Sequence, residues 1–213
     1  MDYLSGIEIV CHSAIRIKKD NITIYIDPYN IKGNYNDADY VFITHEHYDH
    51  FSPDDIKKVI KPDTIIISVP NVIMFSEELQ PDKTKLIAVR PNENYDLKNI
   101  KFETTVAYNK TKLFHQKSKQ WVGYIITING AKYYIAGDTD DLGELEEIEC
   151  DVAFVPIGGM YTMDYKAAAN LVNAIKPKFA IPTHYGLIIG NKEDAEKFRE
   201  NVDKDIKVVE LIK

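Results

Sequence analysis

Apolar residues occur along this chain in short runs or alternating segments, as expected for strands rather than long helices. Segments of this kind in the first half predict strands at residues 7–11, 14–18, 22–26, 40–44, 64–69 and 86–89. Those in the second half predict strands at residues 122–128, 132–136, 152–157, 179–181 and 207–212. Two pairs of turn residues, Asp20-Asn21 and Asn129-Gly130, predict hairpins, and Asn-Gly is the strongest short-range hairpin signal here.

Helix signals lie between these strands. Ser52 as a cap, with Pro53 at the first helical position, predicts a helix over 53–61 that Pro62 ends. A short amphipathic segment follows around 72–79, and helical spacing predicts helices over 164–176 and 192–201, the last capped by Asn191. Each half thus gives hairpin strands and then strand-loop-helix connections. We predict an α/β fold of two β-rich halves facing each other, with helices outside and one domain spanning residues 1–213.

A polar cluster at residues 45–50 follows the strand at 40–44 directly and precedes the helix at Pro53. It reads His45-Glu46-His47-Tyr48-Asp49-His50, whereas chance places about 0.17 histidine in a six-residue window of this sequence. A solvated polar loop is the alternative interpretation. Imidazole and carboxylate groups together favour a metal site, and ligands collect at strand-to-helix loops of α/β sheets. Residues 45 and 47 can converge on one ion, which leaves 49 and 50 for a neighbouring ion.

The string His-x-His-x-Asp-His in this position resembles the signature of the metallo-β-lactamase superfamily. Within it, the chain resembles the branch that contains the L-ascorbate-6-phosphate lactonase and many short hydrolases. The similarity extends over most of the chain, through residues 6–28, the histidine loop, 107–109 with His115, 123–124, 137–140, 156–163 and 182–184. The resemblance implies an αββα sandwich, the metallo-β-lactamase fold.

The resemblance also implies a site with two metal ions. His45, His47 and His115 would bind the first ion, while Asp49, His50 and His184 would bind the second. Asp138 would bridge the two ions, and Asp49 would also orient the attacking hydroxide. From the residues alone, His115, Asp138 and His184 lie in loops or at predicted strand ends, which allows them to converge.

Three further features have two interpretations each. His12 could approach the site from the end of the first strand, or bond a backbone carbonyl as a structural residue. Asp27 precedes a proline, where it could cap a turn; in the superfamily an aspartate in a similar place supports the metal loop. The loop at residues 110–119 carries four lysines around His115, and it is either a solvated basic loop or a rim that attracts anions.

Composition narrows the partners. The 33 acidic against 26 basic side chains give a net charge of −7, which disfavours nucleic acid as a partner. The two cysteines, Cys11 and Cys150, form neither a disulfide framework nor a thiolate metal site, and we expect both to be reduced and buried. Residues 1–5 lack a signal-peptide pattern and no apolar run reaches 18 residues. We expect a soluble cytoplasmic protein with a small-molecule substrate. A lysine loop that attracts anions would favour an anionic substrate.

These observations predict a metal-dependent hydrolase that uses a metal-bound hydroxide on a small ester, lactone or phosphoester. Two divalent ions are expected, with zinc suiting the histidine-rich set and manganese, iron or nickel also compatible. The alternatives are a phosphodiesterase or nuclease of the same fold, a flavodiiron-type oxidoreductase, and a non-catalytic metal-binding regulatory module. The flavodiiron type has glutamate where His47 stands and carries a flavin domain, and a processing nuclease would need a basic face. Substrate, native metal and oligomeric state do not follow from the sequence.

Overall fold

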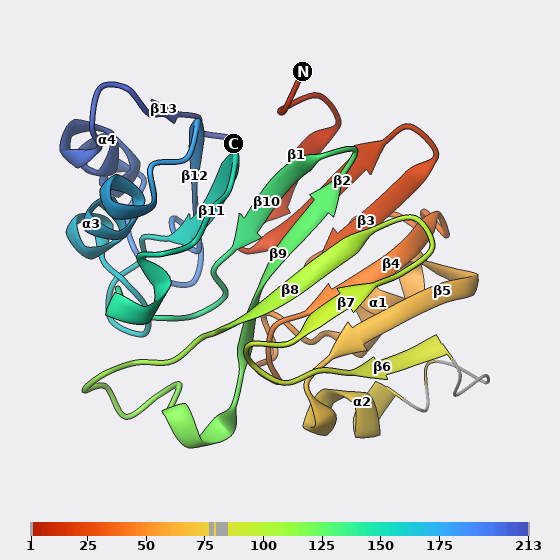
Figure 1. Ribbon diagram of the computed structural model, residues 1–213. Coiled ribbons are helices and arrows are strands. Elements are labelled where there is room, and N and C mark those ends of the chain that lie inside the picture. The colour runs from red at the N-terminus through yellow and green to blue at the C-terminus, as the bar shows by residue number, and fades with distance from the viewer. Residues whose placement is uncertain (1, 77–78, 80–84, 213) are drawn as a thin grey trace. The chain divides into compact units, whose positions relative to one another are not determined.

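The computed structural model of the protein describes residues 2–76, 79 and 85–212 (Figure 1). These residues form two compact units, one within residues 1–90 together with Ile212, the other within residues 91–211. Each unit contains one mixed sheet, which agrees with the expected division into two β-rich halves. Among the described residues, no helix is both long enough and apolar enough to cross a membrane.

The first unit contains a six-stranded sheet in the order β1-β2-β3-β4-β5-β6. Strands β1 to β3 form an antiparallel meander, and β3 to β6 pair in parallel. The strands are β1 Ile7–Cys11, β2 Ala14–Lys19, β3 Ile22–Ile26, β4 Ala38–Ile43, β5 Ile60–Ser68 and β6 Leu86–Ala88. Because β4 lies between two parallel neighbours and is almost wholly buried, it is the apolar strand that the sequence predicted.

The second unit contains a seven-stranded sheet in the order β13-β12-β11-β10-β9-β8-β7. Strands β7 to β10 pair antiparallel, and β10 to β13 pair in parallel, so the unit repeats the plan of the first. The strands are β7 Asn94–Asp96, β8 Lys101–Val106, β9 Val122–Ile128, β10 Ala131–Ile135, β11 Val152–Pro156, β12 Phe179–Thr183 and β13 Lys207–Val208. Asn129 and Gly130 both have positive φ angles, as expected at the predicted hairpin between β9 and β10.

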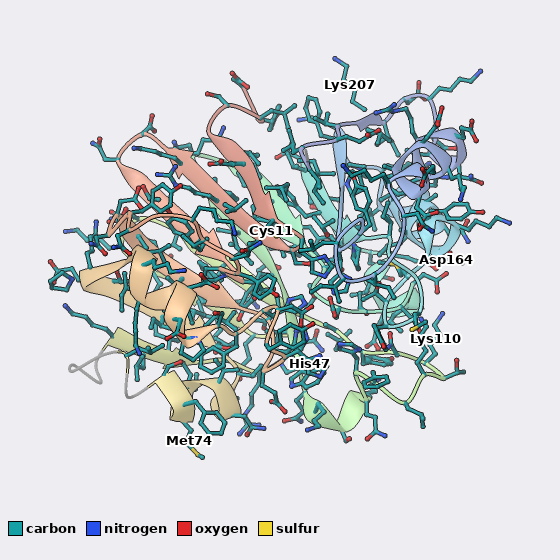
Figure 2. All side chains as sticks on the ribbon, turned by 180° about the vertical axis from the view of Figure 1, so that it is seen from behind. Cys11, His47, Met74, Lys110, Asp164 and Lys207 are labelled. Atoms are coloured by element: carbon teal, nitrogen blue, oxygen red, sulfur yellow. The ribbon has the colours of Figure 1, made fainter. Side chains whose placement is uncertain are left out.

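Each helix has a local cause in the sequence. In the first unit, α1 spans Pro53–Val59 and α2 spans Pro70–Ser76; part of the predicted segment 72–79 lies outside the described residues. In the second unit, α3 spans Tyr165–Ile175, α4 spans Glu193–Asn201, and the two pack together beside β11 (Figure 1). Short 3₁₀ turns cover Lys117–Lys119 and Gly143–Leu145. Met74 on α2 extends its sulfur outward and is 69% exposed (Figure 2).

Several predicted boundaries differ from the structure. The predicted helix over 53–61 ends at Val59, and strand β5 starts at Ile60, ahead of Pro62. The strand can include this proline, which has no N–H, because the pairing of β5 with β4 is irregular there. Lys192, not Asn191, occupies the cap of α4, and the backbone N–H of Asn191 donates instead to the Asp194 carboxylate at 2.8 Å. The two cysteines are free, as expected, but half-buried rather than buried.

Candidate metal centre

The histidine loop of the first unit connects β4 to α1 and is held at both ends. The carbonyl of His47 accepts the backbone N–H groups of His50 at 3.0 Å and Phe51 at 2.7 Å, which folds the middle of the loop into a tight turn. At its far end Ser52 caps α1 by accepting the N–H of Asp55. The imidazoles are therefore carried on a short loop with a fixed entry and exit.

Asp27 organises this loop, although it precedes the cluster in sequence. The carboxylate follows β3, is 1% exposed, and accepts the backbone N–H and the hydroxyl of Thr44, both at 2.8 Å. It also faces the Nδ1 of His50 at 2.7 Å. Burial raises the pKa of Asp27, against the opposing influence of His50 and Thr44. Of the two interpretations of Asp27, these contacts agree with support of the metal loop.

With Asp27 ionised, these bonds assign the proton of two histidines to one ring nitrogen each. An ionised Asp27 can only accept, so the Nδ1 of His50 is its protonated nitrogen. The Thr44 hydroxyl donates its single hydrogen to Asp27 and lies 2.9 Å from the Nδ1 of His45, so it must accept from that nitrogen. Both histidines then have a deprotonated Nε2, the form in which imidazole binds a metal.

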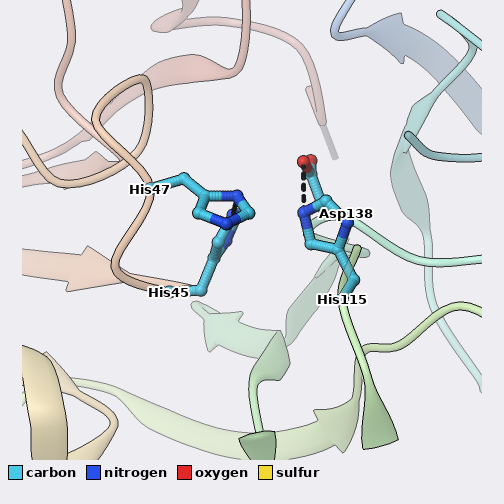
Figure 3. Close-up of side chains that lie close together, drawn as sticks. All are labelled: His45, His47, His115 and Asp138. Atoms are coloured by element: carbon cyan, nitrogen blue, oxygen red, sulfur yellow. Dashed lines mark hydrogen bonds and ion pairs between the residues drawn. The ribbon is translucent and has the colours of Figure 1, made fainter. Parts of the chain in front are cut away.

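His45 and His47 present two nitrogens to one point. The Nε2 of His45 lies 3.0 Å from the Nδ1 of His47, and Figure 3 shows the two rings meeting edge to face. Two nitrogens on one tetrahedral zinc ion would be about 3.3 Å apart, given bonds of about 2.0–2.1 Å. The pair therefore has the spacing of two ligands to one ion.

Asp49 faces two imidazoles. Its Oδ2 lies 3.5 Å from the Nε2 of His50 and 3.5 Å from the Nε2 of His12, and all three side chains are buried. Because the Nε2 of His50 carries a lone pair, a carboxylate oxygen at this distance would repel it unless a cation or a proton stood between them. The donor set thus fits a bound divalent ion. His12, which the sequence left open, is placed beside the predicted catalytic aspartate.

In the second unit, Asp138 is the centre of the ligand set. It follows β10 through Gly137, whose φ of +66° makes the turn that glycine adopts without strain. A single oxygen of Asp138, Oδ2, lies 3.1 Å from the Nε2 of His115 and 3.3 Å from the Nε2 of His184 (Figure 3 shows the first pair). All three side chains are buried. One carboxylate oxygen thus lies between two buried imidazoles.

Asn109 holds the loop that carries His115. Its backbone N–H donates to the carbonyl of His115 at 2.7 Å, and its side-chain amide donates to the carbonyls of Phe114 at 3.0 Å and Tyr161 at 2.6 Å. Asn109 and Thr44 are supporting residues that reasoning from the sequence did not identify. For Thr44 the available signal was its position between a buried strand and a candidate ligand.

A left-handed backbone conformation recurs at these residues. His12, Asp27, His115 and His184 all have φ angles between +45° and +58°, a region that residues other than glycine seldom adopt. Three of the six histidines of the chain are thus in a left-handed conformation. Such conformations persist where the surroundings impose them, and they gather at functional sites.

The lysine loop carries less free charge than its sequence indicates. Lys112 pairs with Asp140 and also donates to the carbonyl of Thr162 at 3.0 Å, while Lys117 pairs with Glu144 at 3.2 Å. Lys110 lies 3.3 Å from the carboxylate of Asp141. Three of the four lysines therefore have a carboxylate partner within the same unit. This pairing supports the solvated-loop interpretation over a strongly attracting rim.

Histidine and aspartate side chains of this chain form clusters whose atoms are close enough to hold a metal ion. Within the first unit, the structure brings together His45 with His47, and Asp49 with His50. Within the second unit it brings together His115, Asp138 and His184. The predicted ligand residues are thus grouped within each unit around buried carboxylates.

Comparisons with known proteins identify the family of the chain. Residues 6–184 match the family model described as the Beta-lactamase superfamily domain. A UPF0173 metal-dependent hydrolase of Thermoplasma acidophilum is 32% identical over 186 residues, which cover 84% of this chain and 78% of the relative. A candidate metal-dependent hydrolase from Parabacteroides distasonis has a TM-score of 0.82 at 30% identity, covering 97% of this chain and 93% of that one.

Igni18, a metallo hydrolase of Ignicoccus hospitalis, has a TM-score of 0.77 at 23% identity, covering 97% of this chain and 94% of that chain, and supports the fold alone. The predicted metallo-β-lactamase fold is confirmed by these matches, with one mixed sheet and its helices in each unit. The chain belongs to the metallo-β-lactamase superfamily, within the family of UPF0173 metal-dependent hydrolases.

Proposed function

We propose that this protein uses two divalent metal ions to hydrolyse a small ester, lactone or phosphoester. Relatives in its family are named metal-dependent hydrolases, which supports the general reaction class. The fold alone would not, since one fold hosts many functions. The ligand chemistry of the two units supports the rest.

The proposed ligands are the seven residues that the sequence singled out. We assign His45, His47 and His115 to one ion, Asp49, His50 and His184 to the other, and Asp138 to both. The spacing of His45 and His47 supports a shared ion in the first unit. The position of Asp138 between two imidazoles supports a bridging role in the second. Zinc suits this nitrogen-rich set best, and manganese, iron and nickel are compatible with it.

One observation carries the proposal. The bonds from Asp27 to Thr44 and His50, and from Thr44 to His45, leave the Nε2 of both histidines as lone-pair donors. A buried carboxylate that orients the imidazole through its other nitrogen is the usual support of a metal-binding histidine.

Bound divalent ions would supply Lewis acidity, which lowers the pKa of a water molecule towards about 7 and polarises the substrate's oxygen. Asp49 would position that water, because its carboxylate is buried yet lies outside the packed sheet. His12 faces the same carboxylate oxygen as His50 does, at 3.5 Å, and would keep Asp49 oriented. No serine or cysteine nucleophile is required by this assignment.

Among substrates, esters and lactones come first and phosphodiesters second. The resemblance to the branch of the L-ascorbate-6-phosphate lactonase supports a lactone or ester. The net charge of −7 disfavours a nucleic acid. A phosphodiester of small size fits the same donor set and is therefore the second candidate.

The test is to load the purified protein with zinc, manganese, iron or nickel, measure the bound metal, and screen esters, lactones and phosphoesters. Asp49→Asn should lower turnover by at least about 100-fold, because the removed charge both binds metal and orients water, while its thermal unfolding stays close to wild type. Asp54→Asn is the matched control, since that carboxylate begins α1 with 92% of its side chain exposed. Bound metal without turnover of any substrate would instead favour the non-catalytic metal-binding module.

A further inference from the structure

The large apolar side chains that are exposed in the described part of the second unit lie on three loops, at residues 107–121, 157–164 and 184–192. Among the described residues of that unit, the exposed large hydrophobic side chains are Leu113, Phe114, Met160, Leu187 and Ile188. Leu113 is 87% exposed and Met160 is 68% exposed. Single exposed apolar residues are ordinary, but their restriction to neighbouring loops is informative. We call the five side chains the apolar rim.

The loops that carry the apolar rim are joined to one another. The amide of Asn109 bonds the carbonyls of Phe114 and Tyr161, and the rings of these two residues meet edge to face with centroids 4.9 Å apart. The loop at residues 157–164 packs closely against the loop at residues 184–192, because a Cβ added to Gly190 would lie 2.9 Å from the Cα of Gly158. The loops that carry the apolar rim therefore lie side by side.

The same loops carry proposed metal ligands. Leu113 and Phe114 immediately precede His115, and Leu187 and Ile188 follow His184 by three and four residues. Apart from Met160, the apolar rim is thus carried by the same loops that hold His115 and His184. Three lysines of the loop at residues 107–121 are paired with carboxylates. A charged group of the substrate is therefore not the part that this surface would bind best.

We propose that the apolar rim binds an alkyl or aryl group of the substrate, so that the enzyme prefers esters or lactones with a hydrophobic acyl part over small polar ones. This inference rests on the hydrolase function proposed above. In the reaction, the oxygen of water forms a bond to the acyl carbon, the bond from that carbon to the alcohol oxygen breaks, and the alcohol leaves with a proton from the water. The rim binds the acyl part throughout and takes no part in proton transfer.

The experiment compares p-nitrophenyl esters from acetate to octanoate with the zinc-loaded protein. Each fully buried methylene contributes about a fourfold gain, so burial of about half of the six added methylenes predicts a rise in kcat/KM of about 60-fold. The triple variant Leu113→Gln, Met160→Gln, Leu187→Gln should lower the octanoate-to-acetate ratio of kcat/KM at least fivefold. Met74→Gln is the matched control: Met74 is 69% exposed, as Met160 is 68% exposed, but lies on α2.

A binding measurement removes the dependence on turnover. Trp121 is the only tryptophan of the chain, and its ring lies 5.3 Å from that of His115, so its fluorescence reports on this surface. Octanoate should change the fluorescence at much lower concentration than acetate, and the triple variant should remove most of that difference.

The outcomes separate the two proposals. If no ester, lactone or phosphoester is hydrolysed, the proposed function fails, whereas fluorescence still tests the rim. If the p-nitrophenyl esters of acetate and octanoate are hydrolysed equally well, only the rim proposal fails. A triple variant that changes the molar mass in solution but not the chain-length ratio would assign the rim to contacts between copies of the chain and overturn the proposal.

Discussion

Replacing Asp27 by asparagine tests the tautomer assignment most directly. Asparagine has the same shape and tolerates the positive φ of +45° at this position, so the backbone should remain as it is. The amide oxygen can still accept the N–H of Thr44. The amide nitrogen, however, replaces an oxygen that faces both the Thr44 hydroxyl and the Nδ1 of His50. His50 is then expected to move its proton to Nε2, the nitrogen that should bind the metal.

The expected effects differ in size. Loss of a carboxylate that supports a metal-binding histidine typically lowers metal affinity about 10- to 100-fold. Stability should fall by only about 1 kcal/mol, because the lost bonds of Asp27 are partly offset by removal of a buried charge. Burial of that carboxyl raises its pKa, which is the sign of such an offset. A loss of about 1 kcal/mol lowers Tm by about 2–4 °C in a chain of this size.

Metal affinity is measured by competition with a chromophoric chelator, and stability by thermal unfolding of the metal-free protein. Asp55→Asn is the control, because that buried carboxylate accepts the backbone N–H groups of Asn30 and Ile31 without touching a histidine. The control should lose stability and keep its metal affinity. Zinc affinity of Asp27→Asn within twofold of wild type, in a folded protein, would refute the tautomer assignment.

Three further predictions follow from the same contacts. Asp138→Ala should reduce bound metal at both positions, as measured by elemental analysis, and an unchanged stoichiometry would exclude a bridging role. Burial alone would raise the pKa of Asp55, but its hydrogen bonds hold that pKa below the ordinary value. The ionised carboxylate therefore stabilises the fold above about pH 4, and this stabilisation is lost as the pH falls through the lowered pKa. Urea unfolding should therefore separate wild type from Asp55→Asn by about 2 kcal/mol at pH 7 and much less at pH 3; an equal gap at both pH values would contradict this. Lys112→Gln should lower Tm, because this lysine pairs with the nearly buried Asp140. The ratio of kcat/KM for anionic and neutral substrates at low salt should stay the same. A selective loss for anionic substrates would instead support the interpretation of the lysine loop as a rim that attracts anions.

The sequence predicted most of the strands because their apolar runs are uninterrupted. The sequence analysis missed β8 because a polar residue, Thr104, occupies one of its buried positions. An apolar residue there would have shown the alternation of apolar and polar positions that is typical of a strand. The Thr104 hydroxyl lies within hydrogen-bond distance of the backbone N–H and carbonyl of Glu93 on the loop before β7, so a polar side chain is buried there with partners. The short strand β7 has no apolar pattern to detect. Propensity and pattern cannot reveal a strand whose buried face is satisfied by hydrogen bonds.

The candidate ligands were readable from the sequence, whereas their supports were not. Three histidines and an aspartate within six residues are a far denser group of metal-binding side chains than chance would give. Thr44 and Asn109 act through hydrogen bonds to residues up to 52 positions away, and no local pattern records such partners. The pairing of Lys112 with Asp140 was hidden for the same reason, since the two are 28 positions apart.

The left-handed backbone at His12, Asp27, His115 and His184 sets stability against function. Each of the three histidines costs about 1 kcal/mol relative to a residue that adopts the conformation freely. Laboratory evolution of this protein for heat resistance alone should therefore accumulate glycine or asparagine at His115 and His184, and the resulting variants should lose metal. Selection that includes catalysis should retain both histidines and find its stabilising changes elsewhere.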